Sequence, residues 1–131
     1  MRAVGEKSVQ SYKNQGKTFE GDVLDQGRKV RRWLMNYISS SPVVALCIEG
    51  HNAVRNVRKI VGPTSPGDAA PGTIRGDFAF DTPMLGDLQN RPIKNLIHAS
   101  GALDEAEREI MLWFAPQDLH VWKRVDEDFL Y

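Results

Sequence analysis

His98 is the residue whose neighbours best suit chemistry. It ends a predicted strand, precedes Ala99-Ser100-Gly101, and is followed by a predicted helix that carries Glu107 and Glu109. A carboxylate bonded to an imidazole fixes the tautomer of the ring and raises its basicity, which suits a nucleophile or a general base. A lone histidine is more often structural, so the residue types alone leave both interpretations open.

A second cluster of interest is the glycine-containing segment Pro71-Gly72-Thr73-Ile74-Arg75-Gly76-Asp77-Phe78. Glycine lets a backbone approach a ligand closely, and the Arg75 guanidinium can bond two phosphate oxygens at once. The same segment spells the adhesion tripeptide Arg-Gly-Asp, but three residues recur by chance. Glycine-rich phosphate motifs of the Walker or dinucleotide type do not occur in the sequence.

Composition narrows the class of protein. The chain has 131 residues, with 17 Lys and Arg against 17 Asp and Glu, so nucleic-acid binding is not expected. The longest apolar run, 43–48, is far shorter than the roughly 20 residues of a membrane span. The start has no signal-peptide pattern. The single cysteine, Cys47, lies in the apolar run and is predicted to be a buried thiol in a reducing compartment, which indicates a cytoplasmic protein.

Hydrophobic periodicity predicts the helices and strands that must position His98 and the glycine-containing segment 71–78. Apolar residues at helical spacing predict a helix over 30–38, one after Asn52, and one from Leu103 to Phe114. Residues 43–48 and 95–99 are predicted strands, the first of them buried, and one helical turn is predicted within 73–78. Residues 1–27 are predicted to form short helical pieces and loops, and 62–72 and 79–94 long loops. Strands that alternate with helices indicate an α/β or α+β domain.

The sequence resembles the nucleoside diphosphate kinase family over about residues 8–119. The Pro-Gly-Thr-Ile-Arg-Gly-Asp-Phe and His-Ala-Ser blocks are the most specific parts of the resemblance. The other matching segments are Ser41-Pro42-Val43-Val44-Ala45, Glu49-Gly50-His51-Asn52-Ala53-Val54, Arg58-Lys59-Ile60-Val61-Gly62-Pro63-Thr64, Asn95-Leu96-Ile97-His98, Ala106-Glu107-Arg108-Glu109-Ile110 and Leu112-Trp113-Phe114.

The resemblance implies an enzyme that moves the γ-phosphate of a nucleoside triphosphate to a nucleoside diphosphate by a ping-pong mechanism. His98 matches the nucleophile that carries the phosphate. Glu109 matches the carboxylate that orients the ring, Ser100 belongs to the same network, and Tyr12 matches an active-site tyrosine. The residues that match the nucleotide-binding positions are Arg58, Thr64 and Arg75 for the phosphates, Asn95 for the ribose, and Val30 and Leu34 for the base.

The family also implies ATP as a phosphate donor, Mg²⁺ carried in with the nucleotide and no dedicated metal site on the protein. Homohexamers or homotetramers are usual, and no membrane partner is implied. The implied fold class is α+β, a ferredoxin-like antiparallel sheet with helices on one face. The whole chain, residues 1–131, is expected to form one such domain, with insertions near 16–27 and 79–92 and a C-terminal arm at 117–131.

The sequence departs from the family pattern at its start. The N-terminal strand–helix–strand, with its Lys-Pro-Asp motif, has no counterpart here, and that strand would lie between 43–48 and 95–99. We expect that residues upstream of Met1 belong to the natural protein. A sheet with such a gap leaves strand edges unpaired. A different class of function therefore stays open, a catalytically impaired module that binds nucleotide or supports assembly.

Overall fold

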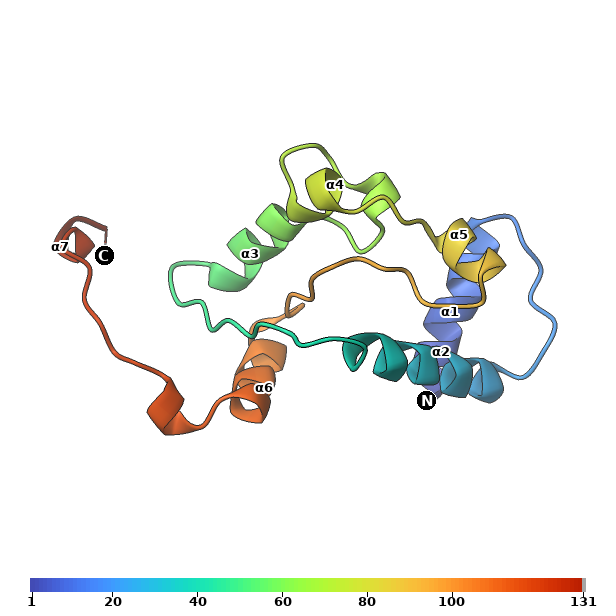
Figure 1. Cartoon of the computed structure of the whole chain (residues 1–131), viewed down its shortest axis with the longest axis horizontal. Helices are drawn as coiled ribbons and strands as arrows, with labels where there is room; N and C mark the ends of the chain where they lie inside the picture. The colour runs from blue at the N-terminus through green and yellow to red at the C-terminus, as the bar shows by residue number, and fades with distance from the viewer. Residues whose placement is uncertain (131) are drawn as a thin grey trace.

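The computed structural model describes residues 1–130 and is built from helices joined by long irregular segments (Figure 1). The α-helices are α1 (Arg2–Asn14), α2 (Val23–Ile38), α3 (Ala53–Val61), α4 (Ile74–Phe78), α5 (Pro83–Leu88), α6 (Leu103–Trp113) and α7 (Glu127–Leu130). Two 3₁₀ turns, η1 (Pro66–Asp68) and η2 (Pro116–Asp118), interrupt the loops. No helix in this part of the chain is long and apolar enough to cross a membrane.

Helices α1 and α2 pack against each other at one end of the molecule. Their backbones approach closely at two glycines. A Cβ on Gly5 would lie 1.9 Å from the Val23 carbonyl oxygen, and one on Gly27 would lie 2.3 Å from that of Met1. Gly5 and Gly27 contributed to the prediction of short helical pieces and loops over residues 1–27, but in the structure they permit a close crossing of two helices. That prediction missed the 13-residue helix α1.

The other predicted helices are confirmed, and side-chain caps begin several of them. The Asp22 carboxylate accepts from the Leu24 amide at the start of α2, and the Thr73 hydroxyl accepts from the Gly76 amide at the start of α4. Asn52 precedes α3 as expected, but it has a φ of 52° and its side chain makes no capping bond. The predicted helix over 30–38 lies within α2, and the one from Leu103 to Phe114 is α6, which ends one residue earlier, at Trp113.

The predicted ferredoxin-like antiparallel sheet is absent, because residues 1–130 contain no strand. Residues 43–48, here called the apolar strip, are irregular. Val44 is 87% exposed and Leu46 72% exposed, and the Cys47 thiol is exposed too, so both the buried strand and the buried thiol were wrong. A strand exists only if a neighbour completes its hydrogen bonds. No backbone hydrogen bond joins the apolar strip to the rest of the described chain.

The second predicted strand, 95–99, is replaced by a tight turn. Leu96 has a φ of 66°, and the Ile97 amide donates to the Asn95 carbonyl at 2.8 Å. This is a three-residue γ-turn, with a left-handed φ that non-glycine residues seldom adopt. The prediction failed here because this backbone bonds within itself and to side chains instead of to a neighbouring strand.

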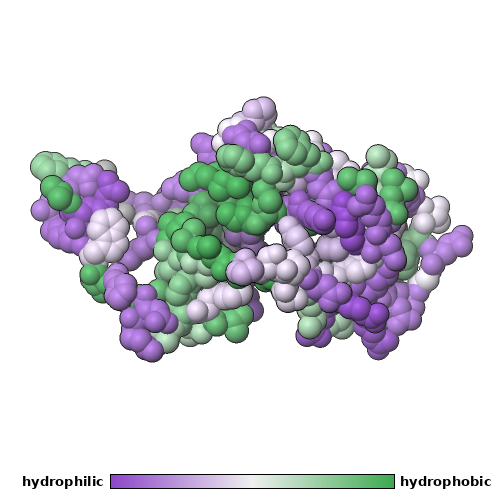
Figure 2. All heavy atoms as spheres, viewed as in Figure 1, coloured by the Kyte–Doolittle hydropathy of each residue, from purple (hydrophilic) through white to green (hydrophobic). Residues whose placement is uncertain are grey.

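The buried core is small. Among the described residues only Val61 of α3 and Ala79 after α4 are buried hydrophobics. Helix α4 packs against η1 and α3 and so joins the loop 62–72 to this centre. Figure 2 shows hydrophobic side chains gathered on the surface in the middle of the molecule, over α3 and the chain beside it. Much of the apolar surface therefore remains exposed to solvent.

Candidate functional site

His98 and Glu109 form the centre of the candidate site. Helix α6 places the Glu109 carboxylate so that its two oxygens lie 3.0 and 2.9 Å from Nε2 of His98. The His98 side chain is 67% exposed and that of Glu109 30% exposed. When Nε2–H donates to the carboxylate, the free lone pair of the neutral ring lies on Nδ1. The pair therefore presents an accessible nitrogen nucleophile with a defined tautomer.

Ser100 completes this group. Its hydroxyl donates to Oε2 of Glu109 at 2.7 Å. Burial by itself would raise the pKa of Glu109, but the hydrogen bonds from Ser100 and His98 outweigh it, so the pKa lies below its ordinary value. The carboxylate thus stays ionised beside the ring. Next to this group, the Gly101 amide donates to the Glu105 carboxylate and fixes the start of α6.

Two arginines converge on the segment that carries His98. The buried Arg75 donates from Nη1 to the Gly62 carbonyl at 3.0 Å, from Nε to that of Asn95 at 3.3 Å, and from Nη2 to that of Ile97. Arg58 donates from Nη1 to the Ala99 carbonyl at 3.2 Å. Burial and then the charge of Arg58 lower the pKa of Arg75. Two neighbouring guanidinium groups of like charge beside His98 create a local field that favours an anion.

Thr64 and Asn95 are also brought together at this place. The Asn95 side-chain amide donates to the Thr64 carbonyl at 3.3 Å. The next residue, Leu96, donates its amide to the Tyr37 hydroxyl at 3.3 Å. Tyr37 was missed as a site residue in the sequence because it was assigned to the apolar stripe of α2. Its phenolic hydroxyl was the available signal, since such groups need a polar partner when partly buried.

The other predicted site residues lie on α1 and α2 and make different contacts. Tyr12 of α1 packs against Phe19, with ring centroids 5.9 Å apart, and Lys17 lies 5.8 Å from its ring. Burial and then the charge of Asp87 raise the pKa of Tyr12. No hydrogen bond in the described chain joins Tyr12 to the His98 group.

The two predicted base-contact residues lie on α2. Val30 is half-buried and Leu34 is 49% exposed. Neither forms part of the hydrogen-bonded group around His98. Hydrogen bonds thus join His98 and Ser100 to Glu109, whereas the base contacts of Val30 and Leu34 stay a prediction.

The two predicted insertions contact each other. Nζ of Lys17, in the first, lies 3.1 Å from the Asp87 carboxylate of α5, in the second. Within the second insertion a bidentate ion pair joins Asp81 to Arg91. Neither ion pair was anticipated from the sequence, because their partners are 70 and ten residues apart in segments whose sequence shows no periodicity.

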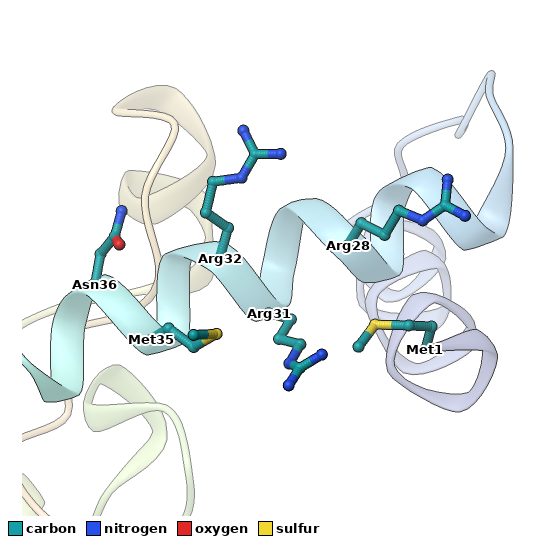
Figure 3. Close-up of a pocket in the computed structure, with 6 residues that line it drawn as sticks. All are labelled: Met1, Arg28, Arg31, Arg32, Met35 and Asn36. Atoms are coloured by element: carbon teal, nitrogen blue, oxygen red, sulfur yellow. The ribbon is translucent and has the colours of Figure 1, made fainter.

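Two surface depressions lie away from these groups. One lies on α2 and is lined by Met1, Arg28, Arg31, Arg32, Met35 and Asn36 (Figure 3). Another is lined by Ser11, Asn14, Gln15, Asp68, Thr82, Pro83 and Met84. Neither includes a predicted site residue. In the described part of the chain, no three His, Cys, Asp or Glu side chains are grouped so that they could hold a metal ion.

Comparisons with known proteins agree with the resemblance seen in the sequence. The family profile described as nucleoside diphosphate kinase matches residues 3–119. A nucleoside diphosphate kinase of Pyrobaculum aerophilum is 42% identical over 124 residues, which are 91% of this chain and 68% of the relative.

Solved structures show the same likeness. An NDP kinase structure from Pyrobaculum aerophilum matches with a TM-score of 0.80 and 41% identity, over 88% of this chain and 66% of that one. A transition-state mimic of the Borrelia burgdorferi enzyme with bound vanadate and ADP matches with a TM-score of 0.76 and 32% identity, over 99% of this chain and 73% of that one. The chain spans about two thirds of the length of the Pyrobaculum structure. With the family profile covering most of its length, the chain belongs to the nucleoside diphosphate kinase family.

Proposed function

We propose that this chain transfers the γ-phosphate of a nucleoside triphosphate to a nucleoside diphosphate through a phosphate carried on His98. The observation that carries the proposal is the exposed imidazole held at Nε2 by the Glu109 carboxylate. The Nδ1 lone pair attacks the γ-phosphorus, and the bond to the oxygen bridging to the β-phosphate breaks. That oxygen leaves with the electron pair, as part of the diphosphate.

The second half-reaction runs in reverse. A terminal phosphate oxygen of another nucleoside diphosphate attacks the phosphorus on Nδ1, and the N–P bond returns its electron pair to the ring. While the phosphate is attached, the ring keeps its proton on Nε2 and carries positive charge. The ionised Glu109 carboxylate stabilises that charge, and Ser100 holds the carboxylate in place.

Charge and position at the transferring phosphate come from the residues around the ring. We assign Arg58, Arg75 and Thr64 to the phosphates and Asn95 to the ribose. Arg58 and Arg75 donate to the Ala99 and Ile97 carbonyls, and two cationic groups at this segment support a site for negative charge. Arg75 also donates to the Asn95 and Ile97 carbonyls, so it contributes to the position of the His98 segment. Tyr12 remains assigned near the histidine, and Val30 and Leu34 to the base.

The same proposal includes the surroundings of the reaction. ATP is the phosphate donor, and Mg²⁺ arrives on the phosphates of the nucleotide, where it supplies further charge neutralisation. The protein acts in the cytoplasm as a homo-oligomer of the hexamer or tetramer type. The relative with bound vanadate and ADP supports nucleotide as the ligand class.

A second candidate is a catalytically impaired nucleotide-binding or assembly module of the same family. The observation that favours it is the apolar strip, whose backbone makes no hydrogen bond to the rest of the described chain. Such a module keeps the arginines and Asn95 but transfers phosphate slowly or not at all.

The test is incubation with ATP labelled at the γ-phosphate, followed by acid and by alkali treatment. A phosphohistidine is lost in acid and survives alkali. We expect this label in the wild-type chain and its complete loss in His98→Ala. His120→Ala, which removes a histidine of the C-terminal arm, is the matched control and retains the label. Folded protein that binds nucleotide and takes up no label supports the second candidate.

A further inference from the structure

Asp81 is a buried carboxylate that the mechanism above does not use. It is 7% exposed and lies after α4, in the loop that leads to the His98 segment. Its oxygens accept from both terminal nitrogens of Arg91, one of them at 3.1 Å, and from the Thr82 amide at 3.0 Å. Its Oδ2 also accepts from the Lys94 amide at 2.6 Å. We call Asp81, Arg91 and the Lys94 amide the Asp81 clasp.

The clasp joins Asp81 to the residue just before the His98 segment, residues 95–98. Lys94 immediately precedes Asn95, and Arg91 also donates to the Pro92 carbonyl at 2.9 Å. One carboxylate therefore joins the start of the second insertion to its end. Its contact with the Lys94 backbone sets where the chain enters the segment 95–98.

That segment needs an anchor at its start because its backbone is strained. The φ of 66° at Leu96 belongs to a sparsely populated region, and such a conformation persists only when its surroundings hold it. Arg75 holds the carbonyls of Asn95 and Ile97, and Tyr37 holds the Leu96 amide. The Asp81 clasp is the corresponding attachment on the N-terminal side of the turn.

We propose that Asp81 is a positioning residue for phosphoryl transfer, acting through the Lys94 amide on the placement of Asn95 and His98. Arg91 supplies the countercharge that keeps the carboxylate ionised and aimed at that amide. The proposal rests on the proposed function and assigns the second insertion a part in it. A purely structural ion pair would stabilise the loop without altering the reacting geometry.

Two substitutions separate these possibilities. Asp81→Ala removes both the ion pair and the acceptor for the Lys94 amide, whereas Arg91→Gln removes the guanidinium and keeps that acceptor. Displacement of a reacting group by about 1 Å can slow a reaction about 100-fold. We expect Asp81→Ala to slow phosphorylation of His98 by about 10-fold to 100-fold at saturating ATP, and Arg91→Gln to produce a smaller slowing.

The matched control is Asp126→Asn. Asp126 also forms a bidentate pair, with Arg124, but in the C-terminal arm. We expect its phosphorylation rate to equal that of the wild type. All rates are measured at a temperature below the thermal unfolding midpoint of every variant, so that each protein is folded to the same extent. If Asp81→Ala does not fold, the Arg91→Gln rate decides, and a rate equal to that of the wild type overturns the proposal.

A second readout does not depend on catalysis. Amide hydrogen exchange and ¹H–¹⁵N chemical shifts report the Lys94 and Ile97 amides directly. We expect Asp81→Ala to lose protection at Lys94 and to shift the resonances of Ile97 and His98. Changes that stop at Lys94, or a folded Asp81→Ala with an unaltered rate, overturn the proposal. If the wild-type chain takes up no phosphate, the proposed function fails, while the resonances still decide whether Asp81 positions His98.

Discussion

The apolar strip and the His98 group are both short segments with strong sequence signals, but they have opposite fates in the structure. The strip is apolar at every position, yet Val44 is 87% exposed and no backbone bond holds it. His98 is bonded at 2.9 Å to Glu109 of α6, which lies eleven residues further along the chain. The contact between His98 and Glu109 needs only a turn and a neighbouring helix, whereas a strand needs another strand. Local partners were enough for this contact and not for the sheet.

The largest expected effect is on the rate of phosphorylation and comes from removing the carboxylate that is bonded to His98. Glu109→Ala leaves the His98 ring without its acceptor, so both tautomers become accessible and the positive charge of the phosphorylated ring loses its counterion. By analogy with removal of the orienting carboxylate of a catalytic triad, phosphorylation should slow by about 10²-fold to 10⁴-fold. Rapid-quench measurement of label uptake checks this.

The matched control for that variant is Glu107→Ala, which removes an exposed carboxylate from the same helix. It should keep the wild-type rate. Equal slowing by both substitutions would mean that the net charge of α6 matters rather than the contact with His98.

Two valines test the comparison directly. Val61 of α3 is 2% exposed, and Val44 of the apolar strip is 87% exposed. Val61→Ala should lower the free energy of unfolding by about 1–3 kcal/mol, from lost burial and the cavity left behind. Val44→Ala should change it by less than about 0.5 kcal/mol. Urea denaturation measures both. An equal loss in Val44→Ala would show that the strip is packed in solution.

Acidification should weaken the Asp81 clasp and so lower the stability of the fold. The hydrogen bonds from Arg91 lower the pKa of Asp81 below its ordinary value, despite burial. A carboxyl whose folded pKa is depressed stabilises the fold above its unfolded pKa, and this contribution is lost as the pH falls through the folded pKa. The stability should therefore fall below about pH 4.

The measurement is thermal unfolding from pH 7 to pH 2, for the wild type and for Asp81→Asn. The variant should be less stable at pH 7 and should lose less stability on acidification. A wild-type curve that parallels that of the variant would assign the acid sensitivity to other carboxylates.

The smallest expected effect on stability comes from a charge in the strip. Leu46 is 72% exposed, so Leu46→Lys should alter the free energy of unfolding by no more than about 0.5 kcal/mol. It should reduce self-association, because an uncovered apolar segment with unpaired backbone groups is a template for pairing. Light scattering against concentration checks this. A large destabilisation would again indicate that the strip is covered.

The sequence predicted helices well wherever the information is local. The stripe over 30–38 lies within α2, and the stripe from Leu103 lies in α6 because its apolar residues share one helical face. Helix α1 was missed since its glycines were taken as loop signals, while Gly5 permits the close approach of the Val23 backbone. Whether a glycine breaks a helix or lets two helices meet depends on a neighbour that no short window contains.

By itself, the sequence determined the family, and it predicted that His98 and Glu109 are partners. Residue types at set spacings carry that information, and the eleven-residue separation of His98 and Glu109 spans one turn and one helix. Only the tertiary structure decided that the two predicted strands do not form, that Tyr37 holds the Leu96 amide, and that Asp81 braces the entry to the site. Each of these depends on which distant groups satisfy a backbone donor or acceptor, and such pairings leave no periodic trace along the chain.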